Sequence, residues 1–393
     1  MDPLHQIDFF YREISVEDIG FYRPDGFHPV HLGDTFSTCP GSNRPRYRVL
    51  HKLGEGYYST VWLAQDMAEN DRGVALKIAI ADARGAHEAS ILLTLSSDTS
   101  HPGKKHILKL LDHFQIRGPN GVHEALVTDI LIPWRHLRRF NDAKRTSHQL
   151  LLALSYLKQQ EVIHGDLHMD NIAFVIPGQD RLTANAWIKE LDIPFLTPVL
   201  PCKLEDQTDN LPKYLVEAAD TMSLVESHIK EHGRDGIYAV VVDFGSAFRA
   251  SDPTPEPQTP PYMCAPEILL RAIQPRKEFF NPNLRFQSDI WSLGCSIYEM
   301  VAGHRLFTRP RECLIDEIIE LVGPLPQSWL DLLNEKPKPH TERDEPSLRA
   351  AAETKQLNSE EGFFQLLTSM LRIDPATRLP PELLIQSTWF DGI

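Results

Sequence analysis

The sequence predicts an α+β protein in which a small antiparallel sheet precedes a larger, mostly helical region. Three short strand patterns, over residues 46–53, 60–65 and 73–80, are separated by glycine-rich or polar turns, as in an antiparallel sheet. Helical patterns dominate after residue 145. The chain has 393 residues, of which 42% are hydrophobic and 24% charged, so it can bury a large core and is too apolar to be disordered.

Helices are expected where apolar residues recur every three or four positions. The ranges with this pattern are 86–96, 148–158, 289–301, 313–321 and 362–371. An apolar run over 239–242 predicts a further strand. Residues 1–46 contain aromatic and acidic residues and a Cys-Pro-Gly-Ser-Asn stretch, so we expect an extension that packs on a folded domain.

Residues 177–236 interrupt this rhythm and are interpreted as an insert. The insert opens with Pro-Gly, and it holds 11 acidic and 6 basic residues. Within it, residues 213–230 predict an amphipathic helix. The insert is either a docking or regulatory element, for which its acidity suggests a basic peptide, or a surface loop, since long excursions cost little closure entropy.

Charge and cysteine content restrict the partners and the compartment. The chain has 54 acidic and 40 basic residues, and this net charge of −14 argues against binding nucleic acid or an anionic membrane. The five cysteines are widely spaced and form no CxxC pair, so neither a disulfide framework nor a zinc ribbon is predicted. No signal pattern and no apolar run of about 18 residues occurs. We expect a cytoplasmic monomer with access to the nucleus.

A glycine-rich turn lies between the first two predicted strands. Gly54 and Gly56 could let the backbone close over phosphates, although an ordinary hairpin gives the same pattern. A dinucleotide-binding turn is excluded because a strand, and not a helix, follows.

A lysine and a glutamate each occupy a position that should be buried. Lys77 interrupts six apolar residues of the third strand, where it needs an anionic partner unless it reaches solvent at a sheet edge. On the next predicted helix, Glu88 shares one face with Ile91, Leu92 and Leu95. An ion pair between the two, with Lys77 also reaching a nucleotide phosphate, accounts for both charges.

Two further polar clusters follow apolar steps. In the stretch 164–171, Asp166 is placed to accept a hydroxyl proton and Asn171 to hold a metal ion. A zinc site is disfavoured because no third ligand lies at a useful spacing. Asp243 ends the apolar run at 239–242 and precedes Phe-Gly, so it is either the cap of a turn or a magnesium ligand.

Taken in order, these motifs resemble those of protein kinases. Gly-x-Gly, the lysine, the glutamate, His-x-Asp-x4-Asn and Asp-Phe-Gly are followed by Ala-Pro-Glu at 265–267, Asp-x-Trp at 289–291 and Asp-Pro-Ala-Thr-Arg at 374–378. The resemblance covers about residues 46–390. It implies a bilobal fold in which residues 1–46 are an extension, 47–131 form the N-lobe with its sheet and main helix, and 132–393 form the helical C-lobe with the insert at 177–236.

The resemblance also implies ATP and Mg²⁺ as cofactors. Lys77 would hold the α- and β-phosphates and be oriented by Glu88, while Asp166 would act on the substrate hydroxyl beside His168. The implied metal ligands are Asn171 and Asp243. The other implied ATP-binding residues are Leu53, Gly54, Glu55, Gly56, Tyr57, Tyr58, Ser59, Val61, Ala75, Thr128, Asp129, Leu131 and Ala173. The implied supporting residues are His164, Asp289 and the pair Glu267 and Arg378.

The opening of the chain has a narrower resemblance to the SR-protein-specific kinases of the CMGC group. It lies in the segments 26–36, 46–54 and 58–63, and the insert between Asn171 and Asp243 falls where that family places its spacer. The resemblance implies a serine/threonine kinase that phosphorylates serines of basic, arginine/serine-rich proteins and serves mRNA processing. It implies no direct nucleic-acid or membrane partner.

Three residues depart from the family pattern. Gly165 and Cys264 replace arginines, and His168 replaces a lysine that contacts the γ-phosphate. Without an arginine at 165, we expect activity without phosphorylation of the activation segment, although Thr254 and Thr259 precede prolines. A histidine with the ordinary pKa of about 6.5 is mostly neutral at pH 7, so we expect a slow enzyme.

Two other functions remain open from the sequence. The loop 164–171 also resembles that of aminoglycoside and choline kinases, which are small-molecule phosphotransferases, but those enzymes lack the Ala-Pro-Glu and Asp-x-Trp segments. The second alternative is a catalytically weak or inactive scaffold of kinase fold. Such scaffolds typically lose a catalytic residue, whereas Lys77, Asp166, Asn171 and Asp243 are all present here.

Overall fold

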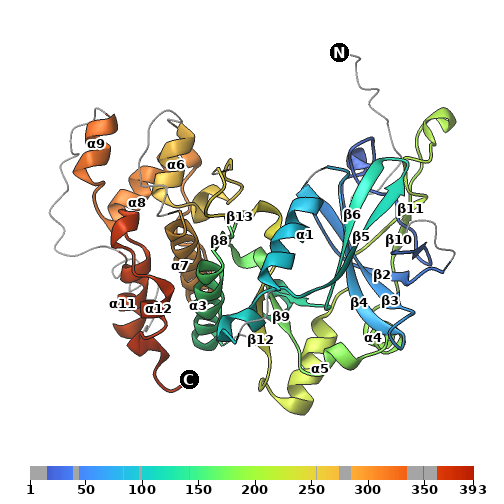
Figure 1. Ribbon diagram of the computed structural model, residues 1–393, viewed down its shortest axis with the longest axis horizontal. Coiled ribbons are helices and arrows are strands. Elements are labelled where there is room, and N and C mark those ends of the chain that lie inside the picture. The colour runs from blue at the N-terminus through green and yellow to red at the C-terminus, as the bar shows by residue number, and fades with distance from the viewer. Residues whose placement is uncertain are drawn as a thin grey trace. The chain divides into compact units, whose positions relative to one another are not determined.

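The computed structural model describes residues 16–38, 44–82, 84–96, 100–140, 142–253, 255–273, 285–333, 348 and 361–393. The chain divides into two compact units (Figure 1). The first contains Met1–Ser96, Leu108–Leu137 and Phe174–Ile237, and the second contains Ser97–Ile107, Arg138–Ala173 and Tyr238–Ile393. The α+β class is therefore confirmed, with the main sheet in one unit and most helices in the other.

The first unit is built on a six-stranded antiparallel sheet in the order β1-β2-β3-β4-β6-β5. The strands are β1 (Thr35–Phe36), β2 (Tyr47–Gly56), β3 (Ser59–Asp66), β4 (Arg72–Ala79), β5 (Leu110–Gly118) and β6 (Gly121–Thr128). The strands predicted from alternation at 46–53, 60–65 and 73–80 are thus β2, β3 and β4.

Both faces of this sheet are covered. On one face, Val74, Leu76 and Ile78 of β4 join a buried cluster with Trp62. Lys77 alternates to the opposite face, where α1 (Arg84–Leu95) packs against β4, β5 and β6 (Figure 1). The helix expected over 86–96 is therefore α1, and its buried face closes the core.

The insert covers the other face of the sheet together with the residues that precede β1. Val216 and the partly buried Tyr214 belong to the cluster around Trp62, and Val30 joins them from the N-terminal side. The Tyr214 hydroxyl accepts a hydrogen bond of 3.0 Å from the Leu32 N–H. Residues 177–236 are therefore part of the first unit, and not an appendage of the helical region in which the sequence placed them.

The helix expected over 213–230 was half wrong. Tyr214–Val216 form β11, which pairs in antiparallel register with β10 (Leu196–Pro198), and the helix α5 begins only at Met222 and ends at His232. The apolar side chains of β11 are recruited into the core of the first unit, so their burial is satisfied by a strand. The remaining elements here are β7 (Ile132–Pro133), α2 (Trp134–Leu137) and α4 (Ala184–Glu190).

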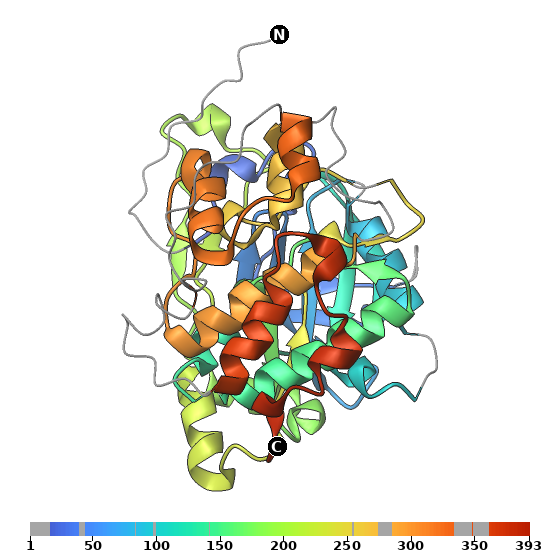
Figure 2. The same cartoon turned by 90° about the vertical axis from the view of Figure 1, so that its left-hand side faces the viewer.

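The second unit is mainly helical. Its central helices α3 (Ala143–Gln159) and α7 (Gln287–Ala302) pack together, and α12 (Pro381–Leu384) contacts α3 while α11 (Glu361–Met370) contacts α7 (Figure 2). The helix expected over 148–158 begins earlier because the Asp142 carboxylate caps it, accepting a hydrogen bond of 3.1 Å from the Arg145 N–H. The other expected helices are α7, α8 (Leu314–Val322) and α11.

Short strands and helices complete this unit. They are β8 (Val162–Ile163), β12 (Tyr238–Val241), β13 (Phe248–Arg249), α6 (Pro266–Ile273) and α9 (Gln327–Leu333). The strand β9 (Ile172–Val175) pairs with β12. The antiparallel pair β8–β13 fixes the start of the loop that carries Asp166. Cys39 and Thr254 lie outside the described residues.

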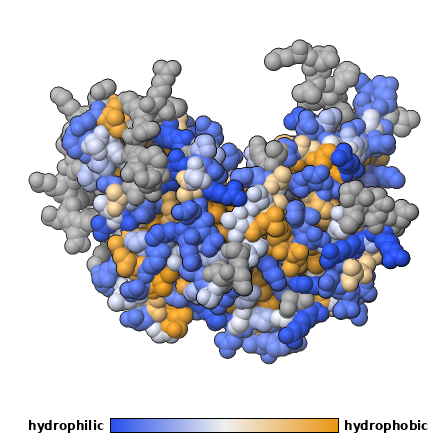
Figure 3. Space-filling model, viewed as in Figure 1, coloured by the Kyte–Doolittle hydropathy of each residue, from blue (hydrophilic) through white to orange (hydrophobic). Residues whose placement is uncertain are grey.

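The described surface is predominantly hydrophilic on the face seen in Figure 3, with scattered apolar groups. None of the helices within the described ranges is long and apolar enough to cross a membrane.

The packing of the insert gives a stability prediction. Leu215 is 7% exposed and contacts the cluster of Tyr22 and Phe27, so Leu215→Ala should lower the free energy of unfolding by about 2–4 kcal/mol. Leu200→Ala, at a position of the same insert that is 55% exposed, should change it by no more than about 0.5 kcal/mol. Denaturant unfolding of the two purified variants measures the difference. Equally small effects would show that the insert is only a surface loop.

Candidate active site

The first group of site residues lies on the main sheet and α1. Lys77 on β4 forms a bidentate ion pair with Glu88 on α1, with 2.8 Å from Nζ to each carboxylate oxygen. Glu88 is 3% exposed, and Ile91, Leu92 and Leu95 are buried on the same helix face. The ion pair expected from the two buried positions is present, and it fixes the ammonium group of Lys77 in one place.

The glycine-rich turn joins β2 to β3 as a tight hairpin. Gly56 pairs with Ser59 and Gly54 with Val61, and the register shifts between Lys52 and Gly54. A Cβ atom added at Gly54 would have no neighbour within 4 Å, and at Gly56 only Ser59 Oγ at 3.9 Å. The packing of the protein therefore does not require glycine here, and the open space suits the close approach of a ligand.

The last residue of β6, Thr128, and the segment that follows contain the positions that the resemblance assigns to ATP binding at the hinge, which are Thr128, Asp129 and Leu131. The Asp129 carboxylate pairs with the Arg72 guanidinium. The carbonyl of Ile130 accepts a hydrogen bond from the side-chain amide of Gln179, the third residue of the insert. The insert thus fixes the backbone of this segment. Ala75 is buried on β4 in the same unit, and Ala173 is buried in the second unit.

The second group of site residues lies on the loop after β8. The Asp289 carboxylate, at the start of α7, accepts hydrogen bonds from the backbone N–H groups of His164 at 2.7 Å and Gly165 at 3.0 Å. Asp289 is 1% exposed, and burial raises the pKa of its carboxyl against the opposing effect of these hydrogen bonds. A ring nitrogen of His164 lies 3.0 Å from the Val242 carbonyl. The loop after β8 is thus held by hydrogen bonds to Asp289 and to the Val242 carbonyl.

Asp166 and Asn171 are brought together by this loop. The Asn171 side-chain amide donates a hydrogen bond of 2.7 Å to the Asp166 carbonyl. The Oδ1 atom of Asp166 is buried and makes no hydrogen bond among the described residues. A buried carboxylate oxygen without a hydrogen bond costs free energy unless a ligand supplies one. Asp166 Oδ1 is therefore suited to accept a hydrogen bond from a substrate hydroxyl.

His168 lies against the same carboxylate. Its Nε2 atom is 3.6 Å from Asp166 Oδ1 and 3.2 Å from Asn171 Nδ2. Burial disfavours the charged ring, but the carboxylates of Asp166, Asp170 and Asp243 outweigh burial and raise the pKa of His168 above its ordinary value. The expectation of an ordinary histidine pKa was therefore wrong, because the sequence alone does not show these three acids converging on one ring.

Asp243 lies next to Asn171 through the backbone, since the Val242 N–H donates a hydrogen bond of 3.0 Å to the Asn171 carbonyl. Its φ angle of 62° is left-handed, a conformation that few residues other than glycine adopt and that clusters at functional sites. The carboxylate of Asp243 and the amide oxygen of Asn171 are hard oxygen donors of the kind that Mg²⁺ prefers.

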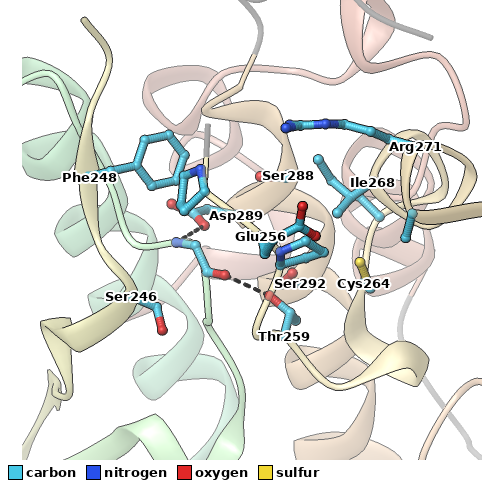
Figure 4. Close-up of a pocket in the computed structure, with 15 residues that line it drawn as sticks. Ser246, Phe248, Glu256, Thr259, Cys264, Ile268, Arg271, Ser288, Asp289 and Ser292 are labelled. Carbon is cyan, nitrogen blue, oxygen red and sulfur yellow. Dashed lines mark hydrogen bonds between the residues drawn. The ribbon is translucent and has the colours of Figure 1, made fainter. Parts of the chain in front are cut away.

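Gly165 is required by the backbone. Its φ angle is 74°, and an added Cβ atom would lie 3.0 Å from the Ser246 carbonyl oxygen, so a larger residue would be strained. The Thr259 hydroxyl donates a hydrogen bond of 2.7 Å to the Gly165 carbonyl (Figure 4). These groups line a cavity of about 250 Å³ that also touches Cys264, Arg271 and Asp289. The Thr259 hydroxyl thus joins the activation segment to the loop that carries Asp166.

Glu267 and Arg378 form the expected pair. The Arg378 guanidinium donates to the two carboxylate oxygens at 2.6 and 2.7 Å, and both residues are buried. Arg378 also donates to the carbonyls of Arg372, Gln287 and Ile373. Its remaining donors are therefore satisfied, as a buried ion pair requires.

Three contacts near the site were missed in the sequence. Gln179 and Arg72 reach residues 49 and 57 positions away, and no local pattern signals such contacts. Lys52 is fully buried beside the glycine-rich turn and pairs with Glu17. Its strand also contains Arg48 and His51, so Lys52 did not stand out as a single charge in an apolar run, the signal used for Lys77.

Comparison with known proteins agrees with this arrangement. The protein kinase domain family matches residues 229–390. A serine/threonine protein kinase of Aspergillus fumigatus is 28% identical over 439 aligned positions, which span 99% of both chains. The serine/threonine-protein kinase SRPK of Physarum polycephalum is 28% identical over 79% of this chain and 72% of its own length. The human SRSF protein kinase 3 is 33% identical over 41% of this chain and 30% of its own.

The match to the kinase domain begins at residue 229, near the end of the insert, and includes Asp243, Glu267, Asp289 and Arg378. The small-molecule phosphotransferase alternative is not supported, since the relatives that span the chain are protein kinases. The chain is a protein serine/threonine kinase, similar to the SR-protein-specific kinases of the CMGC group.

Proposed function

We propose that this kinase transfers the γ-phosphoryl group of ATP to serine hydroxyls of basic, arginine/serine-rich proteins. The observation that carries the proposal is the loop after β8, on which the buried Asp166 Oδ1 makes no hydrogen bond to the described residues and has only the His168 ring near it, at 3.6 Å, while the Asn171 side chain is hydrogen-bonded to the Asp166 carbonyl. A scaffold that had lost activity would have no reason to keep this costly arrangement.

The residues of each unit have separate tasks in this proposal. In the first unit, Lys77 binds the α- and β-phosphates, and the bidentate bond to Glu88 prevents its ammonium group from moving. In the second unit, Asp166 orients the acceptor hydroxyl and takes its proton as the oxygen–phosphorus bond forms and the bond to ADP breaks. Asn171 and Asp243 would hold Mg²⁺, which neutralises phosphate charge when it is bound.

The substrate class rests on charge and on similarity. The chain carries 14 more acidic than basic residues, so a basic peptide is attracted and an acidic peptide repelled over about a Debye length. The human relative is named for SRSF proteins, and the Physarum relative belongs by name to the same group.

Replacement of Asp166 tests the catalytic part. Asp166→Asn should lower the turnover of a serine peptide at least about 100-fold, because the amide cannot take the hydroxyl proton. Binding of ATP, measured by calorimetry, should stay within about threefold of the parent, since we assign Asp166 to the hydroxyl and not to the nucleotide. The parent, shown by mass spectrometry to be unphosphorylated at Thr254 and Thr259, should be active. Nucleotide binding by the parent without any transfer would support a scaffold instead.

A peptide panel tests the substrate class. Transfer of labelled phosphate from ATP should be efficient with arginine/serine repeats and at least about tenfold weaker when glutamate replaces arginine, with the preference declining as salt rises. Equal transfer to both peptides would remove the substrate class while leaving the kinase assignment intact.

His168 offers a gain-of-function prediction. A lysine at this position would carry a full charge toward the developing phosphate charge, so His168→Lys should raise turnover by up to about tenfold. The neutral control His168→Gln should lower it. A lysine variant that is folded but no faster than the parent would show that the histidine is not what limits this enzyme.

A further inference from the structure

The tip of the glycine-rich turn is exposed, yet it contacts a residue from outside the sheet. Tyr57 is 74% exposed, and its ring lies edge-on to the ring of Phe21, with 5.8 Å between the centroids and 72° between the planes. Phe21 ends the short helix Ile19–Phe21 in residues 16–27, which we call the N-terminal segment. Edge-to-face contacts of this kind are attractive beyond the apolar area they bury.

The base of the turn is held by the same N-terminal segment. Lys52 is fully buried one residue before Leu53, and its ammonium group pairs with Glu17 of the N-terminal segment and, at 2.9 Å, with Glu55 of the turn. The Tyr22 hydroxyl donates a hydrogen bond of 2.5 Å to the other carboxylate oxygen of Glu17. A buried lysine needs its carboxylate partners, so this network fixes Glu17 and Glu55 together.

The N-terminal segment is rigid enough to act as a support because the insert and the sheet hold it. Tyr22 and Phe27 are buried against Val199, Leu211 and Leu215 of the insert. The Asn120 side-chain amide donates to the Phe27 carbonyl at 2.6 Å, and the Ala81 N–H to the Gly26 carbonyl at 3.2 Å. Its position is therefore set by the folded first unit.

We propose that the N-terminal segment is a brace that positions the glycine-rich turn, with Phe21 as its positioning residue. This proposal rests on the function proposed above, in which ATP binds beneath the turn. The turn has glycines at 54 and 56 and little packing of its own, so the ring contact at its tip and the network at its base restrict its movement. A restricted turn opens less often, so bound nucleotide leaves more slowly.

The test compares Phe21→Ala and Tyr57→Ala with Phe195→Ala. Phe195 is 60% exposed on the insert of the same unit, and it serves as a matched loss of one phenyl ring. Phe21→Ala and Tyr57→Ala should each raise the dissociation rate of a fluorescent ADP analogue, measured by stopped flow, about 3- to 10-fold. In both alanine variants the KM for ATP should also rise, and kcat should change by a smaller factor than KM. Phe21→Tyr, which keeps an aromatic ring at the position that contacts Tyr57, should resemble the parent.

A second readout does not depend on nucleotide. Hydrogen exchange of backbone amides at residues 54–60 in the nucleotide-free protein should be faster in both alanine variants and unchanged in Phe195→Ala. The double variant Phe21→Ala with Tyr57→Ala should exchange no faster than Tyr57→Ala alone, because Tyr57→Ala already removes the contact of the turn with Phe21.

The outcomes separate the brace from the proposed function. If the parent binds nucleotide and Phe21→Ala behaves as Phe195→Ala does in both measurements, the brace is refuted and the kinase proposal stands. If exchange is faster in the alanine variants but the parent binds no nucleotide, the turn is braced and the proposed function fails.

Discussion

The catalytic loop depends on one buried carboxylate. Asp289 accepts hydrogen bonds from two successive backbone N–H groups, at His164 and Gly165, and it does so from the first turn of a helix. That position favours a negative charge, because the N–H groups at a helix N-terminus give it a partial positive charge. Burial raises the pKa of the Asp289 carboxyl group, and the two backbone hydrogen bonds oppose that rise because they favour the charged form. The positions of Asp166 and Asn171 depend on these hydrogen bonds, because both residues follow on the same loop.

The active-site machinery is supported by elements that are distant in the sequence. The insert binds the segment after β6 through Gln179, and it covers the main sheet with Val216 and Tyr214. In the second unit, the Thr259 hydroxyl holds the activation segment to the catalytic loop through the Gly165 carbonyl. Positioning is the main task of a kinase, since the transferred phosphoryl group needs alignment and electrostatic stabilisation more than covalent chemistry. Such supports therefore bear directly on rate.

Local sequence patterns predicted where strands and helices lie better than they predicted which residues contact one another. Alternation and helical periodicity located β2, β3, β4 and α1, because the spacing of apolar residues within an element shows which of its faces is buried. The Lys77–Glu88 pair could be predicted since each charge lay on an otherwise apolar face and the two elements are adjacent in the chain. The kinase resemblance supplied Glu267 with Arg378 and Asp289 with the catalytic loop. The roles of the site residues remain predictions.

The features that local sequence patterns could not predict depend on contacts between residues that are distant in the sequence. The stretch at Tyr214–Val216 suits a helix by its own periodicity, but its partners at Leu196–Pro198 and in the sheet core make it a strand. The pKa of His168 is raised by Asp166 and Asp170 of its own loop together with Asp243, which is distant in the sequence. The left-handed backbone at Gly165 likewise becomes visible only in the structure.

The central claim, that the buried bonds of Asp289 make the catalytic loop competent, is tested most directly by the turnover of Asp289→Asn. An asparagine at this position has one accepting oxygen, and its amide would face a second donor. The account predicts a folded protein whose kcat for a serine peptide falls at least about tenfold, beside an Asp331→Asn control on the exposed face of α9 that retains the parent's rate. A folded Asp289→Asn enzyme with the turnover of the parent would contradict it.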